Sequence, residues 1–107
     1  MRDMLGAAAQ ISVYTQGMGA VEFVSNALVV DAVVYRLLVI GEAAGAVPAR
    51  IRERHAHVPW QAVRGMRNRL VHEYFGVRTE TVWATVQHDL PVLVAVLEEL
   101  LRVEPEE

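Results

Sequence analysis

The chain has 107 residues and no cysteine, which excludes disulfide bonds, thiolate nucleophiles and sulfur-ligated metal sites. A formal net charge of −3 argues against a protein that holds nucleic acid by overall electrostatic attraction. The length predicts one domain, over residues 1–107, with a core of its own. Because no basic segment followed by an apolar one opens the sequence, as a secretory signal would, we expect a cytoplasmic protein.

Apolar residues recur at helical spacing along nearly the whole chain. A first helix is predicted over about residues 2–17, ended by the Gly-Met-Gly of residues 17–19. A second is predicted from Ser25 or Asn26 to Ala46. Apolar residues surround this second helix, and a helix that is apolar all round must be covered all round. We therefore expect it to be buried at the interface of a homodimer or higher oligomer.

Residues 27–47 have the length of a membrane span but contain Asp31, Arg36 and Glu42. A charge near the centre of a spanning helix costs about 2.5–3.5 kcal/mol on insertion scales. The segment is therefore predicted to be a buried helix of a soluble protein, and no membrane partner is expected.

Pro48 ends the second helix, and residues 48–55 are compatible with a short helix. A third helix is predicted over residues 59–74, with Pro59 in its first turn and Gly76 after its end. A fourth is predicted to begin at Thr79 as N-cap, and Pro91 is expected to kink it because proline removes one backbone hydrogen bond. The predicted fold is all-α, a small up-and-down bundle of four to five helices.

The positive charges are concentrated in one region. All ten basic residues are arginine, and seven of them fall between Pro48 and Arg78. A basic region on an acidic protein indicates a local anion or phosphate site, although a solvated helix face explains the charge pattern equally well.

Several familiar kinds of site are absent from the sequence. It has no glycine-rich phosphate loop. His55 and His57 would point to different sides of a helix, without a nearby carboxylate, so neither a metal site nor a cofactor is expected. His88 and Asp89 are expected on the exposed face of the last helix.

The most polar segment is "MRNRLVHEYFG", residues 66–76. Arg67 offers a guanidinium that binds phosphate bidentately, and His72 offers a group that gives or takes a proton near neutral pH. Together they suffice for metal-free RNA cleavage, in which the base activates the ribose 2′-OH and arginine stabilises the phosphorane. On an ideal helix His72 lies roughly 140° from Arg67, at about 100° per residue. From spacing alone, an arginine and a histidine near a helix C-terminus, where the helix dipole favours them, is the preferred explanation.

Four stretches of the sequence favour a functional site instead: "LLVIGEAA" at 37–44, "PW" at 59–60, "GMRNRLVHEYF" at 65–75 and "DLP" at 89–91. Together they resemble the HepT-like branch of the HEPN superfamily, over almost the whole chain. The motif of that family is Arg, four residues, His, one residue, Tyr, and it falls on Arg67, His72 and Tyr74. Asn68 follows the arginine, as it does in the family.

The resemblance implies a metal-independent endoribonuclease toxin of a type VII HEPN/MNT toxin–antitoxin pair. Arg67 and His72 would be catalytic, in a composite cleft between two protomers. The further residues expected to bind the RNA substrate are Asn68, Arg64 and Arg69. The antitoxin partner would be an MNT-type nucleotidyltransferase that neutralises the toxin by transferring AMP to Tyr74.

Two other functions remain open from the sequence. The chain could be a non-catalytic subunit of a minimal nucleotidyltransferase, with the same cleft binding a nucleotide or a protein partner. It could also be a purely structural helical dimer. Retention of both Arg67 and His72 favours the ribonuclease.

Overall fold

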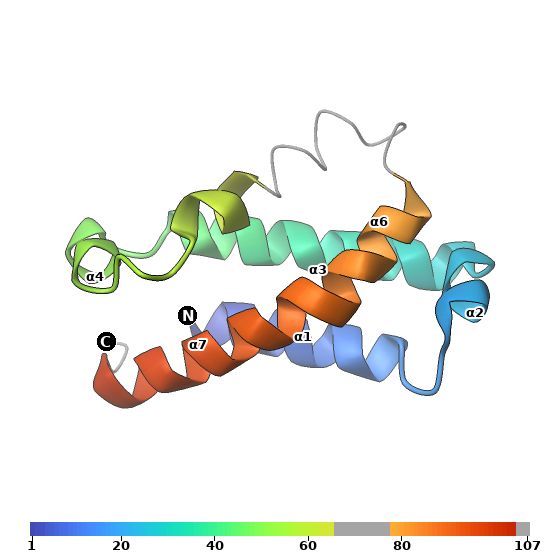
Figure 1. The fold of residues 1–107 in the computed structure, drawn as a ribbon, viewed down its shortest axis with the longest axis horizontal. Coiled ribbons are helices and arrows are strands. Elements are labelled where there is room, and N and C mark those ends of the chain that lie inside the picture. Colours follow the sequence, from blue (N-terminus) through green and yellow to red (C-terminus); the bar gives the residue numbers. More distant parts are fainter. Residues whose placement is uncertain (66–77, 105–107) are drawn as a thin grey trace.

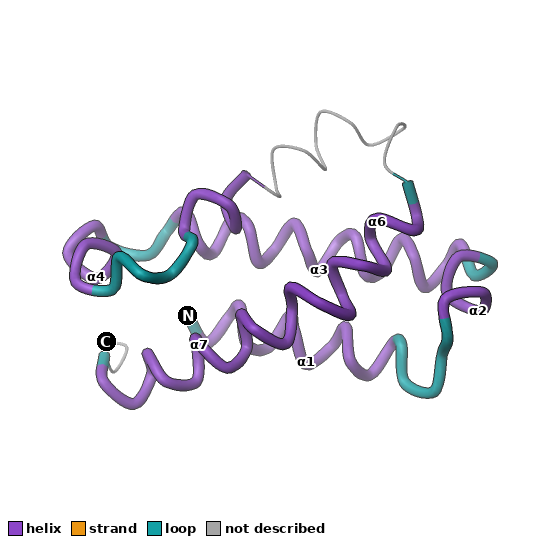
Figure 2. The backbone as a smooth tube through the Cα atoms, in the orientation of Figure 1, coloured by secondary structure: helices purple, strands orange, loops and turns teal. Residues whose placement is uncertain are grey.

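The structure, a computed structural model, describes residues 1–65 and 78–104. Every regular element in these two ranges is a helix (Figure 2), which confirms the predicted all-α fold. The elements are α1 (Arg2–Tyr14), α2 (Ala20–Val24), α3 (Ala27–Gly45), α4 (Ala49–Arg54), α6 (Thr79–Ala84), η2 (Thr85–Asp89) and α7 (Leu90–Val103). α1 packs along α3, and the continuous rod of α6, η2 and α7 crosses the pair (Figure 1).

α1 forms where the apolar spacing predicts it, but it ends three residues earlier than expected. Its buried face consists of Met4, Ala7, Ala8 and Ile11. The end is set locally, because the Thr15 hydroxyl donates to the Ile11 carbonyl at 2.9 Å and Gly17 takes a φ of 76°. Glycine adopts such a positive φ without steric cost, so the Gly-Met-Gly turn is confirmed as the stop signal.

The short helix α2 was not predicted. The Glu22 carboxylate accepts a hydrogen bond from the Gly19 backbone N–H at 3.0 Å, which fixes the first turn. Phe23 is fully buried, and its ring lies 4.9 Å from that of Trp83 on α6. Through this contact α2 packs against α6, the first described helix after residue 77.

α3 agrees closely with the predicted second helix. Asn26 is its N-cap, and the Asn26 side chain accepts a hydrogen bond from the Val29 N–H at 3.2 Å. Its covered face consists of Val30, Val33, Val34, Leu37, Ile40, Gly41 and Ala44. Among the described helices, none combines the length and apolar character needed to cross a bilayer.

The expectation that α3 lacks an outward face is wrong. Asp31 and Glu42 are exposed, as are Leu28 and Tyr35, whose exposed fractions are 82% and 58%. These positions recur at intervals of three, four and seven residues, so they share one side of the helix. The charged groups on that side make α3 an ordinary bundle helix, and its apolar composition alone does not require a partner.

α4 confirms the short helix expected after Pro48. Residues 60–65 are also helical, directly after Pro59 as predicted. Trp60 is buried, and its indole N–H donates to the His55 carbonyl at 3.1 Å. The remainder of the predicted third helix lies outside the described residues.

The last rod differs from the prediction in two details. Thr79 is the first helical residue and Arg78 occupies the N-cap, so the predicted cap is off by one position. The irregularity expected at Pro91 takes the form of a π-helical turn, η2, directly before it. Proline has no N–H to donate and its ring crowds the preceding turn, and a wider turn relieves both problems.

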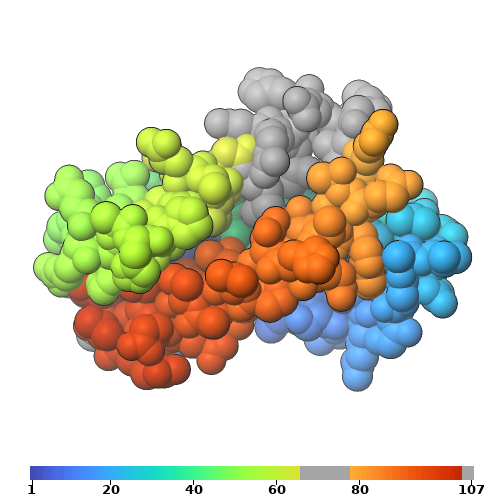
Figure 3. All heavy atoms as spheres, in the orientation of Figure 1, coloured from blue at the N-terminus to red at the C-terminus, as the bar shows by residue number. Residues whose placement is uncertain are grey.

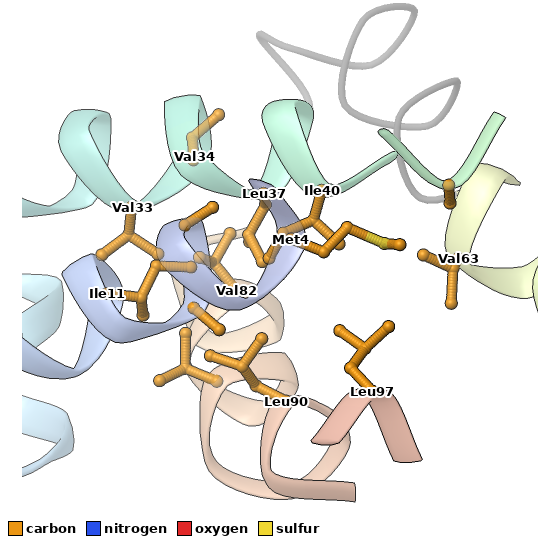
Figure 4. Packing of buried hydrophobic residues seen from close by; sticks show 14 of the residues in the cluster. Met4, Ile11, Val33, Val34, Leu37, Ile40, Val63, Val82, Leu90 and Leu97 are labelled. Carbon is orange, nitrogen blue, oxygen red and sulfur yellow. The ribbon is translucent and has the colours of Figure 1, made fainter. Parts of the chain in front are cut away.

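The buried apolar side chains form one cluster between these helices. Figure 4 shows Val33, Leu37 and Ile40 of α3 pointing toward α1, with Leu90 and Leu97 of α7 closing the opposite side. Met4, Ile11, Val33, Leu37, Ile40 and Leu97 are each exposed by no more than 1%. The described helices are therefore held together by a shared interior.

Candidate active site

Five of the six predicted site residues lie outside the described residues: Arg67, Asn68, Arg69, His72 and Tyr74. The roles predicted for them therefore stay predictions. Arg64 is the one that the structure describes. The structure also describes the chain directly before and directly after residues 66–77.

Buried side chains anchor the chain on both sides of residues 66–77. Before the segment, Trp60 and Val63 are buried, and the Val63 N–H donates to the Pro59 carbonyl at 3.1 Å. After it, Val82 is buried and its N–H donates to the Arg78 carbonyl at 3.2 Å. The chain on either side of residues 66–77 is thus fixed to the bundle.

Arg64 lies over the C-terminal end of α3. A Cβ atom added to Gly45 would be 3.5 Å from Arg64 Nε, so the arginine passes close to that glycine. The C-terminus of a helix carries partial negative charge, which favours a cation there. Arg64 is exposed and, within residues 1–65 and 78–104, makes no hydrogen bond or ion pair. Within the described residues, therefore, no structural bond occupies its guanidinium.

Two other arginines of the basic region are occupied by structural bonds. Arg52 Nε donates to the Val47 carbonyl at 3.1 Å, across the turn that joins α3 to α4. Arg54 forms an ion pair with Glu104, at the end of α7. The concentration of arginine in this part of the sequence therefore reflects packing of α4 as well as any binding of phosphate.

Glu104 connects the end of α7 to α4, a contact that was not predicted from the sequence. Its side chain is buried, accepts a hydrogen bond from Arg54 and contacts His55 Nε2 at 3.3 Å. The hydrogen bond from Arg54 holds the pKa of Glu104 below its usual value of 4.5; burial opposes this shift and His55 adds to it. His55 thus serves this contact, and the described residues contain no group of three side chains able to hold a metal ion.

We expect the Glu104→Gln variant to melt at a lower temperature than the wild type at neutral pH. Because folding lowers this pKa, the ionised carboxylate contributes stability above pH 4.5, and the contribution is lost as the pH falls below that value. The gap between the two melting temperatures should therefore close in acid. Thermal unfolding followed by circular dichroism from pH 3 to pH 7 measures it.

A matched control is Glu99→Gln. Among the described residues Glu99 bonds to Arg102 alone, at 2.8 Å and on the exposed surface, where an ion pair contributes about 0–1 kcal/mol. This variant should melt close to the wild type throughout. A gap for Glu104→Gln that is as wide at pH 3 as at pH 7 would contradict the assignment.

Beside residues 59–63 the structure contains a pocket of about 300 Å³. Its walls are mostly apolar, but they include Thr85 and Asp89 of η2. Asp89 is exposed, as predicted, and the sequence did not place it in a pocket. The signal that could have found it is a polar residue two positions before Pro91, where a regular helix cannot continue unchanged.

Comparison with known proteins identifies the family. Residues 4–100 match the family model described as ribonuclease HepT-like. The chain belongs to the HepT-like ribonuclease family. This confirms the resemblance found in the sequence, and the matched range includes Arg67, His72 and Tyr74.

Relatives in the HepT-like family are similar over most of their length. "Putative RNase MJ0125" of Methanocaldococcus jannaschii is 37% identical, over 94% of this chain and 86% of its own. "Putative RNase TTE0752" of Caldanaerobacter subterraneus is 38% identical, over 83% and 80%. "Probable ribonuclease HepT" of Thermococcus cleftensis is 32% identical, over 94% and 91%. No solved structure matches this chain.

Proposed function

We propose that this protein is a metal-independent endoribonuclease and the toxin of a type VII HEPN/MNT toxin–antitoxin pair. The observation that carries the proposal is the match to the HepT-like family over residues 4–100, a range that contains the Arg67–His72–Tyr74 motif. Relatives that bear the names "Putative RNase" and "Probable ribonuclease HepT" support the same activity.

In the proposed reaction His72 takes the proton from a ribose 2′-OH, whose oxygen attacks the adjacent phosphorus. Arg67 stabilises the charge that develops on the phosphoryl oxygens. The bond to the 5′ oxygen of the next nucleotide then breaks, and that oxygen receives a proton. Arg64, Asn68 and Arg69 bind the flanking RNA. The exposed guanidinium of Arg64, which has no partner in the part of the chain that the structure describes, supports its part in this role.

The test is expression of the wild-type chain and of His72→Ala in a bacterial host. A ribonuclease toxin stops growth and fragments cellular RNA, and the His72 variant does neither at the same protein level. Growth arrest that is equal for both chains would instead favour the alternative, a non-catalytic nucleotide- or partner-binding subunit of a minimal nucleotidyltransferase.

The proposed site is composite, with two protomers facing each other through the exposed side of α3. Leu28 and Tyr35 support this choice of surface, because they lie two turns apart on the same side of α3, exposed by 82% and 58%, and together form an apolar surface that a second copy can cover. We expect Leu28→Asp to raise the dimer dissociation constant at least tenfold, measured by light scattering over a concentration series. The control Val13→Asp changes a residue that is 62% exposed on α1 and should leave it unchanged. A monomeric wild-type protein at micromolar concentration would contradict the composite site.

Neutralisation is proposed to occur by transfer of AMP to the Tyr74 hydroxyl. The added phosphodiester would occupy Arg67 and repel RNA phosphates. We expect the wild type to gain the mass of one AMP unit when incubated with its nucleotidyltransferase, ATP and magnesium, and to lose RNA cleavage. Tyr74→Phe should stay active and unmodified. If the partner silences the Phe variant equally well, inhibition does not use this hydroxyl.

A further inference from the structure

The pocket beside residues 59–63 has the size and walls of a small ligand site. It encloses about 300 Å³, the lower end of the usual range for such sites. Leu37 of α3, Pro59 and Val63 form part of the apolar wall, and Leu93 of α7 completes it. In Figure 3 the yellow-green surface of residues 59–63 faces the orange surface of residues 85–93 across this region.

The two polar side chains among the described lining residues, Thr85 and Asp89, offer hydrogen-bond acceptors. Asp89 occupies the N-cap of α7, but it has helical φ and ψ of −84° and −40° and its side chain makes no capping hydrogen bond. Within the described residues its carboxylate has no hydrogen-bond partner. The Thr85 hydroxyl already donates to the Thr81 carbonyl at 3.1 Å, so it offers the pocket only its lone pairs.

A matching ligand has an apolar body that the aliphatic walls can contact and N–H donors along one edge. Nucleobases have this form, and they are commonly recognised in single-stranded RNA by stacking and by hydrogen bonds to the Watson–Crick edge. Guanine alone among the four RNA bases presents two adjacent N–H donors there, at N1 and N2. The two oxygens of one carboxylate can accept both.

We infer that this pocket binds a guanine base, with Asp89 accepting from N1–H and N2–H and with apolar contacts from Pro59, Val63 and Leu93. The inference rests on the proposed function, since an RNA substrate supplies the base. Three residues separate Val63 from Arg67, and four steps along the chain span at most about 14 Å. The guanine therefore belongs to a nucleotide close to the phosphate that is cleaved, and cleavage is expected beside guanosine.

The test is a nuclear magnetic resonance titration of the full chain, labelled at its methyl groups, with each of the four nucleoside 5′-monophosphates. We expect GMP to shift the methyl signals of Val63, Leu93 and Leu37 and to bind at least tenfold more tightly than AMP, CMP or UMP. Asp89→Asn should lose this preference, because an amide offers one acceptor and places a donor against the second N–H. The control Glu98→Gln, on the exposed side of α7, should keep it.

Equal binding of all four nucleotides, or GMP shifts at methyl groups outside the pocket, would overturn the inference. The readout does not depend on RNA cleavage. A chain that binds GMP through Asp89 but cuts no RNA contradicts the proposed function and leaves the guanine pocket standing. A chain that cuts RNA but does not prefer GMP contradicts only the inference that the pocket binds guanine.

Discussion

Replacing His72 with alanine is expected to lower the rate of RNA cleavage about 10²–10⁴-fold, the usual contribution of a positioned acid–base group. The reason is that no other histidine lies in the Arg–His–Tyr motif. Without it, the ribose hydroxyl must lose its proton to water. Initial rates on a labelled RNA, at a fixed concentration of folded protein, measure the loss.

Two further variants make this result specific. Arg67→Ala should cost about 10²–10³-fold, because electrostatic stabilisation of the phosphorane is lost. His57→Ala serves as the matched control, since His57 is exposed on the turn after α4, and should leave the rate unchanged. All three variants should retain the helical circular dichroism of the wild type. A His72→Ala protein that cuts RNA at the wild-type rate would remove His72 from the mechanism.

Placing a charge at Val33 is expected to unfold the protein. If α3 were apolar because it lies at an interface, a charge at Val33 or Leu37 would dissociate the oligomer and leave each protomer folded. Both side chains lie in the core within one protomer, with exposed fractions of 0% and 1% (Figure 4). A buried carboxylate without a partner costs on the order of 4 kcal/mol or more, against a total of about 5–15 kcal/mol for a domain.

The control for Val33→Asp is the same substitution at Val13, whose side chain is 62% exposed on α1. Its effect on the free energy of unfolding should stay within about 0.5 kcal/mol. Urea unfolding followed by circular dichroism compares the two variants. If Val33→Asp unfolds at the same urea concentration as Val13→Asp, the packing of α3 against α1 is wrong.

The long helices could be predicted from the sequence because their signals are local. Asn26 begins α3 and Gly17 follows the end of α1, as the sequence indicated. α2 was missed because five residues contain too little periodicity, and because it depends on the packing of Phe23 against a distant Trp83. The outward face of α3 was also misjudged, since composition does not tell which side neighbouring helices cover.

For the candidate site, the sequence supplied the motif and the structure supplied its surroundings. Arg67, His72 and Tyr74 were found by resemblance, because spacing on an ideal helix does not bring the first two together. Glu104 escaped notice among the C-terminal acids, since its partner Arg54 lies fifty positions away in the chain. Asp89 was placed correctly on the surface, but a pocket depends on three segments that meet only in the folded chain.

In the proposed reaction this chain cleaves RNA without a metal ion, through attack by the ribose 2′-OH. The most direct measurement is the chemistry of the new ends, determined after purified wild-type protein cuts a defined RNA in excess EDTA. The proposed reaction predicts full activity, with a 2′,3′-cyclic phosphate on one fragment and a 5′-hydroxyl on the other. Activity abolished by EDTA, or fragments that end in a 5′-phosphate and a 3′-hydroxyl, would contradict it.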